Sequence, residues 1–535
     1  MSFLGLSRIQ GFSGLRAWFG TDLTVRKCLA FSFLAGFFVR LIPEVLAFPY
    51  PVGFDTVYYA VVMKSGVVWA NWNSFFNSTW LFNAFMILLY DVSRADPFLL
   101  LKLVVPLLYG LNAAGVFWFS RKVLSWNVKL SLLAVGLFSI QLASLRISWD
   151  LLRNTLGLGL LLFTLPFVGK VSSKRNFGLL VVFSLLTVFA HEYAAVTLLA
   201  VVLGLLLWHL LRKRLVKMDL LTFLAILPAL SIFSIGIFLR LHPTESPTVT
   251  NVIGAGDTVT GSFRFFANYL SIRDSYFYYP TYLWLLVDVL VLFALLYLPY
   301  FYLVWKGLFR NAFLDLWAAL LLIGSFGCLL FPFFALEYWD RWMFMLVYPF
   351  TFYAVNGVRA FLKNRDSVNH KHSFGAFSRK MKGMLIITGL LGCTYLATPV
   401  LMSTVNAGIF SAYPACVHFS FAPTVPYEDV DSVMQAMNWL NTNMGSSSCV
   451  VLHLAFVEWG LLYLNQTHEI VHFNNDVNLA VNVSVEHGFK QVFFIWWWNK
   501  NIGWYGITVP NGFIRLKDFG RISVYSYVSG NPNGS

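Results

Sequence analysis

Charged residues are scarce in this sequence, and their scarcity excludes an ordinary soluble protein. Asp, Glu, Lys and Arg make up 12% of the 535 residues, whereas a typical soluble domain contains about 25%. Apolar stretches of about 20 residues run without an acidic residue, which is the length that crosses a bilayer core of about 30 Å as a helix. A soluble mixed sheet would not need such stretches. We therefore expect a polytopic α-helical membrane protein.

Cysteine is also sparse, and most of it carries no redox information. Of the five cysteines, Cys28, Cys328 and Cys393 fall inside apolar stretches, where they act as small apolar side chains. Cys416 and Cys449 lie in the polar C-terminal part, where they could form one disulfide if that part faces an oxidising compartment. The polar N-terminal stretch lacks a cleavage-site pattern, so we expect the first span to act as its own insertion signal.

Basic residues outnumber acidic ones, 38 to 24, giving a formal net charge of +14. They gather in short runs between apolar stretches, as cytoplasmic loops do, so we expect no nucleic-acid partner. About eleven spans are predicted, and no internal repeat stands out. The predicted spans are 28–47, 97–119, 129–147, 151–169, 176–191, 193–211, 218–241, 281–305, 313–335, 342–362 and 383–402.

One orientation places every basic loop on the same side, from the pair Arg121 and Lys122 to the run between Lys363 and Lys382. It predicts a multi-pass plasma-membrane protein with a cytoplasmic N-terminus and an extracytoplasmic C-terminus. The apolar segment 79–90 is too short to span, so we expect it to lie on the outer surface as an amphipathic helix within the first outer loop, 48–96.

The composition shifts at about residue 403, where Asn, Ser, His and Asp appear between short β-branched strings. This predicts a transmembrane domain over 1–402 and a small extracytoplasmic α/β domain over 403–535. The predicted elements of the second domain are helices at 427–443 and 455–464, strands at 448–453, 469–473 and 491–496, and a hairpin at 512–528.

Ionisable residues at span ends gather on the predicted outer side. Such residues are costly near a membrane and are often functional, although any single one could merely anchor a helix end. Asp55 follows the first span within Phe54-Asp55-Thr56-Val57-Tyr58-Tyr59. The set consists of Asp55, Tyr58, Tyr59, Arg146, Asp150, Arg153, His191, Glu192, Glu337, Asp340 and Arg341.

This arrangement resembles the GT-C superfamily of membrane glycosyltransferases, which use polyprenyl-phosphate sugars such as dolichol-phosphate sugars. The resemblance lies in Asp55 after the first span, in Ser148-Trp149-Asp150 in the second outer turn, and in Glu337-Tyr338-Trp339-Asp340-Arg341-Trp342 before a late span. The resemblance covers the membrane part of the chain. Within the superfamily, the sequence is distantly similar to protein mannosyltransferases and oligosaccharyltransferases. The Trp-Trp-Asp-Tyr-Gly motif of oligosaccharyltransferases is absent. The overall arrangement resembles prokaryotic or archaeal members.

The resemblance implies that Asp55 and Asp150 are catalytic acids and that Arg341 meets the lipid-linked phosphate. The chemistry agrees, because a carboxylate can take the acceptor's proton and the planar guanidinium suits phosphate oxygens. Arg153 and Arg146 are further phosphate-binding candidates, although a helix-end ion pair or a snorkelling side chain would also explain them.

A divalent metal such as Mg²⁺ or Mn²⁺ is an open prediction. Its candidate ligands are Asp55, Asp150, His191 and Glu192, and a pair packed at a helix break would explain His191 and Glu192 equally well. The expected partners are a polyprenyl-phosphate-linked sugar donor, a glycan, lipid or protein acceptor, and membrane lipids. Two competing hypotheses are a transporter or flippase of lipid-linked glycans and a non-catalytic scaffold of a glycan-assembly complex.

Overall fold

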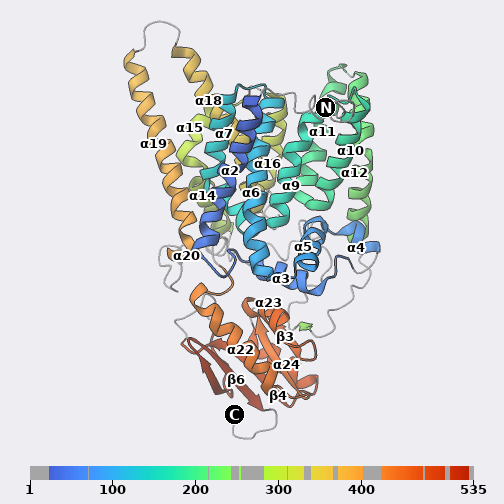
Figure 1. Ribbon diagram of the computed structural model, residues 1–535, viewed down its shortest axis with the longest axis vertical. Coiled ribbons are helices and arrows are strands. Elements are labelled where there is room, and N and C mark those ends of the chain that lie inside the picture. Colours follow the sequence, from blue (N-terminus) through green and yellow to red (C-terminus); the bar gives the residue numbers. More distant parts are fainter. Residues whose placement is uncertain are drawn as a thin grey trace, which may run out of the picture.

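The computed structural model describes residues 23–69, 72–214, 216–241, 252–254, 282–309, 311–330, 339–365, 371–401, 423–473, 476–499 and 507–528. Long helices run roughly parallel along the long axis of the molecule, and a smaller region with a β-sheet lies beyond one end of them (Figure 1). Short helices lie between these two parts.

The helical region contains a helix at each place where the sequence predicts a span. Several predicted spans are broken into two helices, for example α7 and α8, which meet at 60°. The helices are α2 (Leu23–Leu46), α6 (Pro97–Lys122), α7 (Val128–Ile140), α8 (Leu142–Asp150), α9 (Leu152–Thr164), α10 (Lys174–Ala190), α11 (Glu192–Leu211), α12 (Lys217–Leu241), α14 (Tyr282–Tyr297), α15 (Phe301–Gly307), α16 (Ala312–Leu330), α17 (Trp339–Met345), α18 (Val347–Arg365), α19 (Lys371–Leu396) and α20 (Thr398–Leu401).

Six of these segments are long and apolar enough to cross a membrane, and the bent pair α7 and α8 would make a seventh. They are α2, α6, α11, α12, the α14–α15 segment and α16. The chain is therefore a multi-pass membrane protein. The number of eleven spans stays a prediction, because helices such as α18 and α19 include several charged residues.

Three short helices follow α2 in the first outer loop: α3 (Thr56–Ser65), α4 (Trp72–Asn77) and α5 (Leu81–Ser93). The amphipathic helix predicted at 79–90 is present as α5, which buries Phe82, Met86 and Ile87 on one face and exposes Leu88 and Val92 on the other. In Figure 1 these helices lie between the long helices and the sheet.

The C-terminal region is built on a six-stranded mixed sheet with strand order β1-β3-β2-β4-β6-β5. The strands predicted from the sequence are present, and helix α24 was not predicted. The elements are β2 (Ser448–His453), β3 (Glu469–Phe473), β4 (Gln491–Trp497), β5 (Ile514–Phe519), β6 (Ile522–Val528), α22 (Val430–Asn443), α23 (Leu454–Tyr463) and α24 (Val477–Glu486).

The edge strand β1 (Val252–Gly254) comes from the connection between α12 and α14, far from the rest of the sheet in sequence. It pairs in parallel with β3, with Val252 opposite Ile470. This strand was not predicted from the sequence. The predicted division at residue 403 thus leaves out one strand of the sheet.

A shared apolar core joins the first outer loop to the C-terminal region. One cluster of buried side chains contains Tyr59 and Phe82 from the loop helices together with Phe456 from α23. The rings of Phe98 in α6 and Trp459 in α23 lie 5.9 Å apart, and Lys64 of α3 donates to the carbonyl of Leu462 at 3.2 Å. This core fixes α23 beside α3, where the candidate site lies.

Candidate functional site

The loop that carries Asp55 is pressed against the turn that carries Asp150. Gly53 has φ +118°, and a Cβ there would come within 2.5 Å of the Trp149 carbonyl oxygen and 2.7 Å of the Asp150 Cβ. Only glycine accepts both this backbone conformation and this approach. The backbone N–H of Phe54 then donates to the Asp150 carboxylate at 3.2 Å. Two segments about 100 residues apart are thereby locked side by side.

Asp55 stands at the N-cap position of α3, yet its side chain makes no cap hydrogen bond. Residues at such positions usually accept from the first backbone N–H groups of the helix. Asp55 is half-buried, while its neighbours Thr56 and Val57 are buried. Its carboxylate therefore lies at the start of a helix without forming a hydrogen bond to the first backbone N–H groups of that helix.

Asp150 forms an ion pair with Arg146 one turn earlier in α8. Both side chains are nearly inaccessible, 3% and 6% exposed. With Phe54 on one carboxylate oxygen and Arg146 on the other, Asp150 is fully engaged in holding the loop. The Arg146 Nε is buried and has no hydrogen-bond partner among the described residues, so one donor of this guanidinium stays available. The guanidinium carbon of Arg146 lies 5.5 Å from the centroid of the Phe344 ring.

Arg153, in the first turn of α9, is positioned by the first outer loop. Its guanidinium donates to the Thr79 hydroxyl at 3.2 Å and interacts with the Tyr59 hydroxyl, with Tyr58 and Glu192 also close enough to influence its charge. The predicted residues Tyr58, Tyr59, Arg153 and Glu192 thus come together from three elements.

The predicted pair Asp340 and Arg341 opens α17, which packs against α8. Arg341 interacts electrostatically with both Asp55 and Asp340, and Arg146 also acts on Asp340. The structure therefore gathers Asp55, Asp150, Arg146, Arg153, Asp340 and Arg341 into one charged cluster. Glu337 lies outside the described residues.

The environment of Asp55 favours its protonated form. Burial and the neighbouring charge of Asp150 raise its pKa from 3.8 to about 6, while Arg341, Arg153 and Arg146 pull in the opposite direction. Without the arginines, the same burial would raise it further. A carboxylate tuned towards neutrality in a cluster of cations has the properties of a general base.

A second carboxylate, which the sequence analysis missed, approaches Asp55 from the C-terminal region. Glu458 lies on α23, the helix that packs against α3. Burial and the charge of Asp55 raise its pKa from 4.5 to about 7, and its Oε2 atom is buried without a hydrogen-bond partner among the described residues. No sequence signal links residues 55 and 458, because only the tertiary fold brings α23 to α3.

A buried charge network behind the site was also missed. Arg40 pairs with Glu44 at 2.8 Å within α2, and Lys102 of α6 donates to the Glu44 backbone carbonyl at 2.6 Å. Arg40 also donates to the Ser148 carbonyl and hydroxyl, at 3.1 to 3.2 Å. This clamps the turn before Asp150. The signal was present as opposite charges four residues apart inside a predicted span.

Two of the four candidate metal ligands, His191 and Glu192, make contacts with other protein groups. His191 caps α11 by accepting from the Tyr193 N–H at 3.2 Å, and Glu192 lies beside Arg153. Among the residues that the structure describes, no three His, Cys, Asp or Glu side chains are grouped so that they could hold a metal ion. A divalent metal stays an untested prediction.

Known proteins assign neither a family nor an activity to this chain. No protein family matches the sequence, and no curated protein matches it. Among solved structures, the crystal structure of ArnT from Cupriavidus metallidurans in the apo state is similar over 97% of this chain and 99% of that chain, with 12% sequence identity and a TM-score of 0.47. At this identity and TM-score, the similarity assigns neither a fold family nor an activity to this chain.

Proposed function

We propose that this chain is an integral-membrane glycosyltransferase of the GT-C type, with its reaction centre at Asp55. The observation that carries the proposal is a half-buried carboxylate with a pKa of about 6 that does not cap its helix and is influenced by three arginines. The sequence resemblance at the same residue agrees with it. The donor is a polyprenyl-phosphate-linked sugar, and the acceptor carries a hydroxyl group.

In the proposed reaction, Asp55 accepts the proton of the acceptor hydroxyl as its oxygen attacks the anomeric carbon. The bond between that carbon and the phosphate oxygen breaks, so the polyprenyl phosphate leaves with the bonding electrons and the anomeric configuration inverts. A carboxylate with a pKa near 6 is largely ionised at neutral pH and remains basic enough to share the proton.

Arginine side chains stabilise the leaving phosphate in this proposal. Arg341 is the first choice, because its positive charge acts directly on Asp55 and the sequence resemblance places the phosphate-binding arginine at this position. The Nε of Arg146 offers a second donor, and Arg153 borders the opposite side near Tyr59. Donors fixed in a partly desolvated site stabilise developing charge more strongly than water does.

Asp150 has a positioning role in the proposed site. Its two oxygens are held by Phe54 and Arg146, so it keeps the Asp55 loop against α8. Glu458 completes the site from the side of the C-terminal region, where it would accept a hydrogen bond from the acceptor or sugar. With the predicted orientation, the reaction takes place on the outer side of the plasma membrane.

The test is sugar transfer by the purified full-length protein from a panel of polyprenyl-phosphate sugars. Asp55→Asn should lower the rate about 10²- to 10⁴-fold, the usual contribution of a general base. Asp91→Asn is the matched control, since Asp91 is an exposed aspartate of the same loop whose partner is the exposed Arg94. Parallel reactions with EDTA test the predicted metal.

Transfer lost in Asp55→Asn and kept in Asp91→Asn would support the proposal. Equal activity of wild type and Asp55→Asn would refute the role of Asp55. Failure of every donor with a folded protein would favour the transporter or the scaffold, and uptake of a lipid-linked glycan into vesicles would then separate these two.

A further inference from the structure

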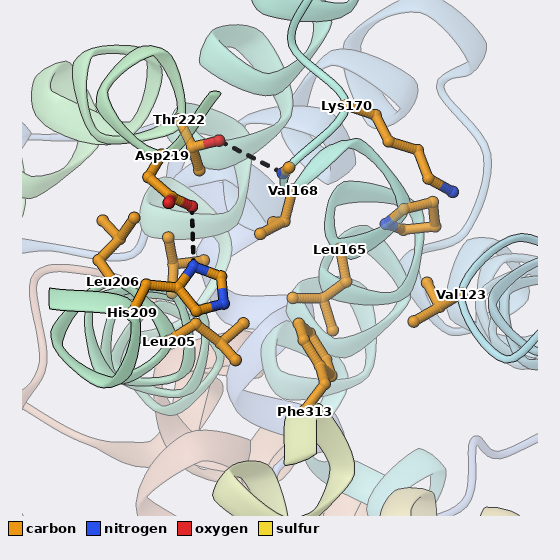
Figure 2. A pocket seen from close by; sticks show the side chains of 13 residues that line it. Val123, Leu165, Val168, Lys170, Leu205, Leu206, His209, Asp219, Thr222 and Phe313 are labelled. Carbon is orange, nitrogen blue, oxygen red and sulfur yellow. Dashed lines mark hydrogen bonds and ion pairs between the residues drawn. The ribbon is translucent and has the colours of Figure 1, made fainter. Parts of the chain in front are cut away.

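A cavity opens at the far end of the helical region from Asp55. It has a volume of about 210 Å³ and lies between the ends of α6, α9, α11, α12 and α16. In Figure 2, Lys170 and Val123 lie on one side of it and His209, Asp219 and Thr222 on the other. Leu165, Leu205 and Phe313 form an apolar floor between the two sides. The cavity is therefore amphiphilic, and it lies at the ends of helices that include the spanning candidates α6, α11, α12 and α16.

One cation, Lys170, lines this side of the cavity, and two more, Lys122 and Arg121, lie near it without lining the cavity. Lys122 is close enough to Lys170 and Arg121 for their positive charges to act on it. Lys170 donates to the carbonyl of Lys122 at 2.8 Å, Arg121 donates to the carbonyl of Trp126, and the Lys122 ammonium lies 4.8 Å from the ring of Trp118. In the part of the chain that the structure describes, no ion pair joins any of the three to a carboxylate.

Local structure explains where these side chains lie but leaves their charge uncompensated. A lysine at a helix C-terminus interacts favourably with the last carbonyls, which accounts for Lys170. It does not account for two more cations beside it, because like charges repel. An anion that enters the cavity would remove this repulsion.

The acid on the opposite side is already engaged. One oxygen of the Asp219 carboxylate lies 3.0 Å from His209 Nδ1, and the other accepts from the Val216 N–H at 3.0 Å. The other ring nitrogen of His209 faces the cavity (Figure 2). Asp219 thus orients the imidazole and leaves the field at Lys170 positive.

We propose that this cavity binds the headgroup of an anionic phospholipid from the adjacent leaflet. The phosphate lies at Lys170, within the field of Lys122 and Arg121, and the glycerol and first acyl carbons cover Leu165, Leu205 and Phe313. A lipid fits better than a free anion, because the apolar floor would stay wet beneath inorganic phosphate. Basic pockets between spanning helices bind anionic lipid headgroups in this way.

The test is a lipid titration of the delipidated full-length protein in detergent, followed by native mass spectrometry. Phosphatidylglycerol and phosphatidylcholine with the same acyl chains are compared. Phosphatidylglycerol should bind more tightly, and Lys170→Gln and Lys122→Gln should each weaken it about fivefold, since a lysine near a membrane phosphate contributes about 1 kcal/mol. Lys129→Gln, an exposed lysine at the same end of the helices, is the matched control and should bind as wild type does.

Three outcomes would overturn the proposal: equal binding of the two lipids, equal loss in Lys129→Gln, or binding of glycerol 3-phosphate as tight as that of phosphatidylglycerol. The last would show a site for free phosphate esters. Lys122→Gln keeps the hydrogen bond from Lys170 to the Lys122 carbonyl. It therefore tests the site even if Lys170→Gln, which loses this hydrogen bond, fails to fold. Melting temperatures of all variants confirm that they are folded.

Discussion

The two ends of the helical region treat charge in opposite ways. At the Asp55 end, acids and arginines alternate in a desolvated cluster, and most are paired, as Arg146 is with Asp150 and Arg40 with Glu44. At the Lys170 end, cations lie together without acidic partners among the described residues. Buried charges must be balanced within the protein, because desolvation is costly. Cations beside headgroups can be balanced by the lipid, so the first arrangement agrees with the proposed reaction centre and the second with the proposed lipid site.

The largest expected effect comes from unbalancing the buried end. Asp150→Asn leaves Arg146 buried without its anion and should destabilise the protein by about 3 to 5 kcal/mol. The measurement is thermal unfolding in detergent. Arg146→Met together with Asp150→Asn removes both charges and should recover much of the loss. If Asp150→Asn is as stable as wild type, the Arg146–Asp150 pair is solvated, and the two ends of the helical region do not differ in how their charges are balanced.

Steric closure of the Asp55 loop gives the next largest effect. In Gly53→Ala, the new Cβ meets Trp149 and Asp150 at a positive φ, so strain of about 1 to 3 kcal/mol is expected, with loss of sugar transfer. Gly66→Ala is the control, because Gly66 also has a positive φ, +66°, but nothing lies within 4 Å of its Cβ position. Similar behaviour of both variants would mean that only the backbone conformation matters.

The titration of Asp55 makes a prediction about pH. Its pKa is about 6 in the fold and 3.8 when unperturbed, so the folded state binds more protons between these values and stability from this group falls as pH rises. Asp55→Asn should therefore melt at a higher temperature than wild type at neutral pH, with the difference vanishing below pH 4. A variant less stable than wild type at neutral pH would show that the ionised carboxylate is well solvated or paired.

Glu458 should add a second ionisation above that of Asp55. Its pKa of about 7 lies above the pKa of Asp55, about 6, and the charge of Asp55 is one of the causes, so Glu458 ionises after Asp55 as the pH rises. An ionisation near pH 7 is therefore expected in kcat/KM against pH for the wild type and should be absent in Glu458→Gln, with Glu486→Gln on the exposed end of α24 as control. Identical pH profiles of wild type and Glu458→Gln would place Glu458 outside the electrostatic reach of the reaction.

The smallest effect is expected at an exposed ion pair. Asp91 and Arg94 lie 3.3 Å apart in α5, and their side chains are 53% and 73% exposed. Asp91→Asn should change the free energy of unfolding by less than about 1 kcal/mol, because solvent screens such a pair. A loss as large as that of Asp150→Asn would show that burial does not decide the cost.

The sequence predicts the parts of this molecule that follow from local patterns. Apolar length places the helices, and short β-branched strings place strands such as Ser448–His453, which is buried along its whole length. Charge at span ends predicts the grouping of Asp55 with Asp150 and Arg341, because topology alone brings span ends together. Glu458 escapes this reasoning, since its approach depends on how α23 docks on α3. Arg40 and Glu44 were overlooked because apolar neighbours hide a charged pair within a span.

Strand β1 bears on how the protein is made. A ribosome completes Val252–Gly254 more than 200 residues before the strand that pairs with it, β3. Until then, the connection that carries β1 must wait with an open hydrogen-bonding edge while further helices insert. The pairing of β1 with β3 therefore forms only after β3 has been synthesised, and β3 follows every helix of the helical region in the chain. The position of Glu458 near Asp55 likewise depends on a segment that is made after those helices.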